Sequence, residues 1–203
     1  AFERGDDIHE LTSMKVFNVD ADGVTAEMRR RAKTVNFGIV YGISAFGLSD
    51  RLDIPRAQAV DLIESYFTQY PGIRDYMDKT IEFCREHGYV ETVTGRRRYL
   101  RDINSRNNSL RSAAERLAMN SPIQGTAADM LKLAMIQVHR ALRVGDFRTK
   151  MLLTVHDEIV FDMHRDEQES VTPVIEQCMT TALPMHVPIV VEMGVGRNWL
   201  EAH

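Results

Sequence analysis

The sequence has little cysteine, since Cys84 and Cys178 are the only two among 203 residues. They are isolated and lack a metal-ligand spacing, which excludes a disulfide framework and fits a reducing cytoplasm. No run is long and apolar enough to span a membrane. Ala1 to Asp7 is polar and charged with no apolar run behind it, so we expect no signal peptide.

Basic residues are scarce at both ends of the chain. Residues 1–28 hold two basic and seven acidic side chains, and residues 157–203 hold two basic and nine acidic ones. The middle, 29–156, holds 21 basic and 13 acidic side chains, a balance of +8 in a chain whose net charge is −4. A positive middle between acidic ends indicates a surface that binds phosphates. An ordinary solvated surface is the alternative.

The most informative segment has Arg29, Lys33, Phe37 and Tyr41 at intervals of four residues. On a helix over 25–42, this spacing forms one slowly turning stripe about 18 Å long. A helix N-terminus favours the binding of anions, and Arg29 and Lys33 add positive charge near it. The aromatic rings offer flat faces to a base or sugar. The stripe therefore suits a nucleoside triphosphate. The alternative is that the cations are merely solvated and the rings belong to the core.

Two glycines follow the rings of this stripe closely. Gly38 and Gly42 each weaken a helix by about 1 kcal/mol relative to alanine. We therefore expect something to approach the backbone closely at these positions.

The remaining pattern predicts an α+β fold with a mainly helical first half and a small antiparallel sheet at the end. Two hairpins are expected, a basic one over 89–100 and an acidic one over 151–162, with a final strand over 187–193. Two helices are expected near 109–120 and 125–144, with a kink between them at Ser121-Pro122. The other helices are expected near 7–17, 44–52, 55–70, 71–87 and 167–182.

The acidic hairpin carries Asp157 and Glu158 between two apolar runs. Burying unpaired carboxylates costs heavily, so they lie either in an exposed turn or at a divalent cation. Mg²⁺ takes oxygen ligands and accepts few protein carboxylates, with substrate phosphates completing its shell. His156 beside them could donate to a phosphate or base. Zinc is disfavoured because no second His or Cys lies at ligand spacing.

Together these segments resemble family A DNA polymerases, the bacterial DNA polymerase I group. Arg29 to Gly42 is similar to the motif of the fingers helix, and Val155 to Glu158 to the second metal-carboxylate motif of the palm. The segment Arg116 to Asp129 resembles the stretch between these motifs. Further matches are found at 7–9, 92–98 and 198–203. The resemblance implies a fingers subdomain over 1–108 and a C-terminal palm portion over 109–203.

The resemblance also implies roles on the nucleotide side. His9, Arg29 and Lys33 would hold the incoming triphosphate, with Lys33 catalytic. Phe37 would pack against the sugar and base, and the family links a phenylalanine here with discrimination against dideoxynucleotides. Tyr41 would lie at the template-base stacking position.

Further roles concern the DNA and the metal. Asp157 would bind catalytic Mg²⁺ with Glu158 supporting it, and both would be catalytic. Contacts to the minor-groove side of primer and template would come from Arg116, Asn120, Gln124 and His156. Such contacts check pair geometry without reading sequence, because minor-groove acceptors are degenerate among base pairs.

The implied activity is template-directed DNA synthesis, in which a dNTP is added to a primer 3′-OH with two Mg²⁺ ions. The partners would be primer-template DNA and dNTP in a bacterial cytoplasm, near the nucleoid, with no membrane. A non-catalytic DNA-binding module is the alternative, although acidic residues would then repel DNA. A metal-dependent hydrolase centred on 156–158 leaves the stripe unexplained.

One family motif, an earlier palm strand bearing an aspartate, does not occur here. We therefore expect this chain to be a C-terminal piece of a longer polymerase whose N-terminal portion is missing. Alone, it is expected not to extend a primer. An open sheet edge would also favour self-association.

Overall fold

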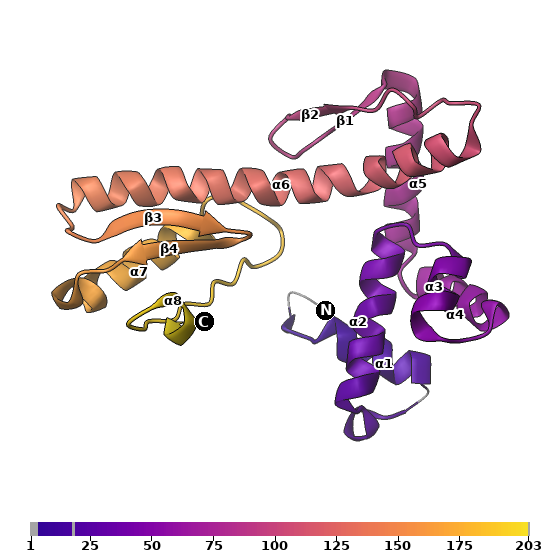
Figure 1. Ribbon diagram of the computed structural model, residues 1–203, viewed down its shortest axis with the longest axis horizontal. Helices are drawn as coiled ribbons and strands as arrows, with labels where there is room; N and C mark the ends of the chain where they lie inside the picture. The colour runs from indigo at the N-terminus through magenta and orange to yellow at the C-terminus, as the bar shows by residue number, and fades with distance from the viewer. Residues whose placement is uncertain (1–3, 18, 203) are drawn as a thin grey trace. The chain divides into compact units, whose positions relative to one another are not determined.

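The computed structural model describes residues 4–17 and 19–202, so His203 of the expected C-terminal match lies outside the described residues (Figure 1). The chain divides into two compact units, Ala1–Gly125 and Thr126–His203. Helices dominate, and the strands form two separate two-stranded sheets. The predicted α+β class is confirmed. Among the described residues, no helix has the length and apolar character that crossing a membrane requires.

The first unit begins with short helices whose starts are capped by side chains. Asp7 Oδ1 accepts from the backbone N–H of His9 at 2.8 Å, and Thr25 Oγ1 accepts from that of Met28 at 3.2 Å. Such caps satisfy N–H groups that a helix start leaves unpaired. The elements are α1 (Ile8–Phe17), η2 (Ala21–Gly23), α2 (Ala26–Val40), α3 (Ala45–Leu52), α4 (Arg56–Gln69), α5 (Pro71–His87), β1 (Tyr89–Glu91) and β2 (Arg97–Tyr99).

Two apolar clusters hold the first unit together. Val35 and Ile39 of α2 pack with residues of α3 and α4, among them the fully buried Leu48. The second cluster joins α5, the β1–β2 hairpin and α6 (Asn108–Val144), with Cys84 and Val90 at its centre. Burying each such side chain stabilises the fold by about 1.5–3 kcal/mol.

The second unit contains the C-terminal part of α6, the acidic hairpin and an amphipathic helix after it. Its core joins Val138 and Leu142 of α6 to Val171 and Ile175. Glu167 anchors the start of β3 by accepting from the backbone N–H groups of residues 148 and 149. The elements after α6 are β3 (Lys150–Val155), β4 (Glu158–Asp162), η3 (Arg165–Glu167), α7 (Gln168–Thr180) and α8 (Trp199–Ala202).

The predicted division into two helices, 109–120 and 125–144, is wrong, because α6 is one helix from Asn108 to Val144. Proline removes one backbone donor and normally kinks a helix. Here hydroxyl groups donate to carbonyls around the proline: Ser121 Oγ to Leu117 O, and Tyr76 Oη to Met119 O at 3.1 Å. The proline therefore lies inside the helix, and the two hydroxyl groups give the carbonyls of residues 117 and 119 additional hydrogen bonds.

The predicted final strand over 187–193 is also wrong. The structure assigns no strand to these residues, and β3 and β4 pair only with each other among the described residues. A strand exists only where a neighbour accepts and donates its backbone hydrogen bonds. A β-prone composition alone is therefore insufficient. The predicted fingers–palm boundary at residue 108 stays a prediction.

Close approach to the glycines of the stripe comes from the chain's own side chains. A Cβ atom on Gly42 would lie 2.5 Å from Met119 Cε and 3.1 Å from Arg116 Cγ. Gly42 also has φ of +72°, which non-glycine residues rarely adopt. At Gly38 the neighbour is Ile43, whose Cγ2 would lie 3.1 Å from an added Cβ.

We expect Gly42→Ala to destabilise the fold by about 1–3 kcal/mol, because it adds backbone strain and a clash with Met119. Urea unfolding followed by circular dichroism measures this. Gly72→Ala is the matched control, because nothing lies within 4 Å of an added Cβ there. An equal loss in both variants would contradict a specific constraint at Gly42.

Candidate functional site

The four-residue stripe lies on the exposed face of α2, with Tyr41 at the C-cap of the helix. Phe37 and Tyr41 are 44% and 41% exposed, whereas Val35 and Ile39 of the same helix are buried. Arg29 and the other cation of the stripe are also exposed. The two rings are therefore not core residues, and the ordinary alternative for them is excluded.

Within the stripe the two rings and one cation contact one another, and His9 of α1 lies beside them. The Phe37 and Tyr41 rings stack at a centroid distance of 6.0 Å and an angle of 27°. Lys33 Nζ lies 5.9 Å from the centroid of the Phe37 ring, within cation–π range. The centroid of the His9 ring lies 5.6 Å from that of Phe37. Cations and rings thus form one continuous surface.

His9 is oriented from behind by Asn36. Thr12 Oγ1 donates to Asn36 Oδ1 at 2.9 Å, and Asn36 Nδ2 lies 2.9 Å from His9 Nδ1. Because an amide nitrogen only donates, we assign His9 Nδ1 as the acceptor and place the ring proton on Nε2. Nε2–H is then available to an oxygen of a bound phosphate.

Asn36 is a site residue that the sequence analysis missed. It is only 5% exposed, between the apolar residues of the buried face of α2. Buried amides are almost always hydrogen-bonded, so an asparagine in an otherwise apolar helix face was the available signal.

Asp7 links the start of α1 to the stripe. Its Oδ2 accepts from Arg29 Nε at 2.7 Å while its Oδ1 caps α1. The hydrogen bond from Arg29 lowers the pKa of Asp7, and the backbone hydrogen bonds at the cap lower it further. An ionised Asp7 thereby restrains a cation that would otherwise be a freely moving side chain.

The charge state of His9 follows from the same cluster. Burial lowers the pKa of His9, and the nearby positive charges of Arg29 and Lys33 lower it further, whereas Asp7 opposes them. His9 is therefore neutral at pH 7, in agreement with the assigned tautomer.

The predicted DNA-contacting residues of α6 share one side of that helix. Arg116, Asn120 and Gln124 are four residues apart, and Arg116 and Gln124 are exposed. The Oδ1 atom of Asn120 is buried and, among the described residues, has no hydrogen-bond partner. A buried amide oxygen without a partner marks a place where a ligand or water can donate.

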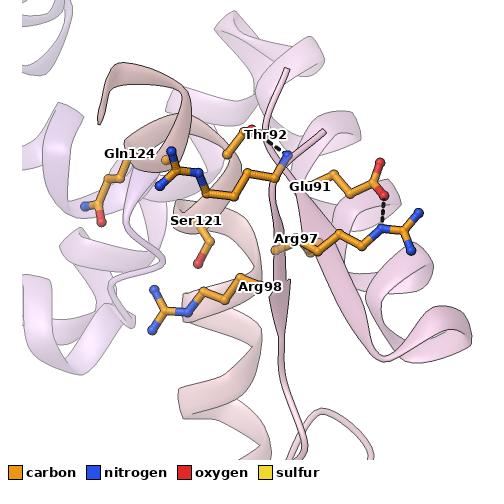
Figure 2. A pocket seen from close by; sticks show the side chains of 9 residues that line it. Glu91, Thr92, Arg97, Arg98, Ser121 and Gln124 are labelled. Atoms are coloured by element: carbon orange, nitrogen blue, oxygen red, sulfur yellow. Dashed lines mark hydrogen bonds and ion pairs between the residues drawn. The ribbon is translucent and has the colours of Figure 1, made fainter. Parts of the chain in front are cut away.

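A pocket of about 140 Å³ lies between this part of α6 and the basic hairpin, lined by Ser121, Gln124, Gly125 and residues 90–92 and 96–98. Figure 2 shows Arg98 on the side of the strand where Ser121 and Gln124 lie, while Arg97 points the other way toward Glu91. Arg97 Nε donates to Glu91 Oε1 at 2.6 Å. Alternation along β2 thus leaves Arg98 to face the pocket.

The acidic turn connects β3 and β4, which pair antiparallel with Val155 opposite Glu158. His156 has φ of +55°, in the left-handed region, and is exposed. Asp157 is exposed and makes no hydrogen bond or ion pair within the described part of the chain. Glu158 is half-buried and accepts from the indole of Trp199. The predicted hairpin is confirmed.

The two carboxylates suit one class of metal. Among residues 4–17 and 19–202, no group of three or more His, Cys, Asp or Glu side chains could hold an ion. Zinc held by protein ligands alone therefore does not fit. Mg²⁺ commonly uses one or two carboxylates and completes its shell with water and phosphates. Asp157 and Glu158 fit that partial ligand set.

Comparison with known proteins identifies the family. A sequence model of DNA polymerase family A matches residues 1–201. The chain belongs to DNA polymerase family A. It is 51% identical over 203 residues to DNA polymerase I of Streptococcus pneumoniae (strain ATCC BAA-255 / R6), covering all of this chain and 23% of that protein. DNA polymerase I of Lactococcus lactis subsp. lactis (strain IL1403) is 49% identical, also over 100% and 23%.

A solved structure agrees with this family assignment. The POL domain of Pol1 from M. smegmatis, in complex with DNA primer-template and dNTP, has a TM-score of 0.95 and 42% identity. The match covers 100% of this chain and 36% of that one. With 23% of each DNA polymerase I covered, the chain spans about a quarter of the length of the curated relatives it matches. The resemblance to family A polymerases is confirmed over the whole length of this chain.

We expect the imidazole pKa of His9 to lie below 6.5. Lys33→Met should raise this pKa, because it removes a nearby positive charge, and Asp7→Asn should lower it further, because it removes a nearby negative charge. Imidazole NMR titration measures this, with His9→Gln for assignment. Since the folded pKa lies below the unfolded one, protonation favours the unfolded chain, and stability falls as pH drops through about 6.5. Shifts of the same sign in both variants would contradict this electrostatic account.

Proposed function

We propose that the protein containing this chain performs template-directed DNA synthesis, transferring a nucleotide from a dNTP to a primer 3′-OH with two Mg²⁺ ions. The observation that carries the proposal is the exposed stripe of α2, whose cations and stacked rings form one surface with the neutral His9 of α1. The similarity to DNA polymerase I proteins, and to a Pol1 domain solved with primer-template and dNTP, supports it.

On the nucleotide side, Arg29, Lys33 and the Nε2–H of His9 bind the triphosphate. Phe37 packs against the sugar and base, and Tyr41 stacks at the template-base position. The rings can do this because they are stacked on each other and half-exposed, which leaves faces and edges for a ligand.

On the DNA side, Arg116, Asn120, Gln124 and His156 contact the minor-groove side near the new base pair. The unpaired Oδ1 of Asn120 supports this role, because a buried acceptor needs a donor. Exposed Arg116 and Gln124 add donors on the same side of α6. Primer-template DNA is thus the proposed second partner.

In the reaction, the primer 3′-oxygen forms a bond to the α-phosphorus of the dNTP. The bond from that phosphorus to the β-phosphate oxygen breaks, pyrophosphate leaves, and the hydroxyl proton is released to solvent. Negative charge grows on the leaving oxygens, where Arg29 and Lys33 stabilise it. Asp157 and Glu158 would hold Mg²⁺, which would supply charge stabilisation to the reacting phosphate.

The alternative of a non-catalytic DNA-binding module is disfavoured by the acidic turn. An exposed Asp157 next to Glu158 repels phosphates unless a cation lies between them. The hydrolase alternative leaves the cations and rings of the α2 stripe unexplained. Self-association and a nucleoid-associated cytoplasmic location stay predictions.

We expect Asp157→Ala to lower nucleotide incorporation by the full-length protein at least about 100-fold, since a metal ligand acts on the transition state. Primer-template binding, measured by fluorescence anisotropy, should change little. Asp162→Ala, an exposed carboxylate at the other end of the same hairpin, is the matched control and should retain activity. Equal losses of DNA binding and incorporation in Asp157→Ala would refute the metal role.

We further expect residues 1–203 alone not to extend a primer, because adjacent Asp157 and Glu158 supply only part of the ligands that two Mg²⁺ ions require. Primer extension with Mg²⁺ tests this, and far-UV circular dichroism must show that the helices are formed. Template-dependent incorporation by the folded 203-residue chain would overturn the expectation.

A further inference from the structure

The C-terminal segment makes a specific contact with the acidic turn. The indole Nε1–H of Trp199 donates to Glu158 Oε2 at 3.2 Å across 41 positions of the sequence. Trp199 is the single tryptophan of the chain. Its side chain is 52% exposed, so burial is not what holds it in place.

A compact loop presents Trp199 to the turn. Asn198 Oδ1 accepts from the backbone N–H of Glu201 at 3.1 Å, and Glu201 Oε1 accepts from Asn198 Nδ2 at 3.0 Å. Glu201 Oε2 also accepts from the backbone N–H of Arg197 at 3.0 Å. This reciprocal cap defines the start of α8, of which Trp199 is the first residue.

Two glycines let the chain fold back on α8. A Cβ atom on Gly194 would lie 1.8 Å from Ala202 O, and one on Gly196 would lie 2.6 Å from Ala202 N. Both contacts are closer than real Cβ atoms tolerate, so any larger residue would displace the loop. The loop is therefore a built structure in which both glycines and the cap determine where the indole points.

We propose that Trp199 is a positioning residue that holds the Glu158 carboxylate in a metal-binding orientation. The inference rests on the proposed function, because it assigns Glu158 to Mg²⁺. A glutamate side chain has several rotatable bonds, and ordering them lowers the affinity of a metal site. The indole N–H of Trp199 hydrogen-bonds one carboxylate oxygen of Glu158 and so orients the side chain before the ion binds. Residues that hydrogen-bond to metal ligands commonly orient them in this way.

The test measures Mn²⁺ binding by electron paramagnetic resonance to the full-length protein with dNTP and a primer-template whose primer lacks a 3′-OH. Trp199→Phe keeps an aromatic ring but removes the donor, and we expect Mn²⁺ affinity to fall about 10-fold. Leu200→Ala is the matched control, since Leu200 lies in the same helical turn and is 87% exposed. It should bind as the unaltered protein does.

A double-mutant comparison separates positioning from general loss of structure. In a Glu158→Ala background, Trp199→Phe should have no further effect on Mn²⁺ affinity. An additive effect there, or unaltered affinity in Trp199→Phe while Asp157→Asn weakens binding, would overturn the role of Trp199 and leave the proposed function standing. If Asp157→Asn also bound Mn²⁺ normally, the proposed function and this inference would both be wrong.

Discussion

A helix can offer cations and rings to solvent as a fixed surface only when its opposite face is held by packing. In α2 that hold comes from Val35 and Ile39, which are buried against α3 and α4. Without it, each long side chain of the stripe would have to be ordered when a ligand bound, and that ordering would weaken binding. The apolar face of α2 is thus the constraint on which the proposed triphosphate site depends.

A second layer of polar residues extends this constraint to single atoms. Asp7 holds Arg29, and Asn36 holds His9, although neither residue lies on the stripe. The Asp7 carboxylate also starts α1, so the position of His9 and the position of Arg29 are set by one side chain. Charge and orientation in the cluster are therefore coupled, since a change at Asp7 alters the helix start, a cation and the pKa of His9 together.

Features that depend only on neighbouring residues in the sequence were predictable. Features that depend on contacts between segments far apart in the sequence were not. The four-residue interval of the stripe and the carboxylates between two apolar runs are local, and both hold in the structure. Pro122 lies inside the continuous α6, which the local rule for proline does not predict, and a strand over 187–193 needed a neighbour. The bond between Trp199 and Glu158 likewise joins segments 41 residues apart, which no periodicity reveals.

The exposure of the acidic turn fits the chemistry of the ion proposed for it. Mg²⁺ loses its water reluctantly and is rarely enclosed by protein ligands alone. A buried pair such as Asp157 and Glu158 would repel each other and cost heavily without a cation, whereas at a turn they remain hydrated until ion and substrate arrive together. The left-handed backbone of His156 makes the tight turn that keeps both carboxylates at the end of the hairpin. An exposed carboxylate beside a hydrogen-bonded one therefore suits a metal ion that also binds substrate phosphates better than a site enclosed by protein ligands alone would.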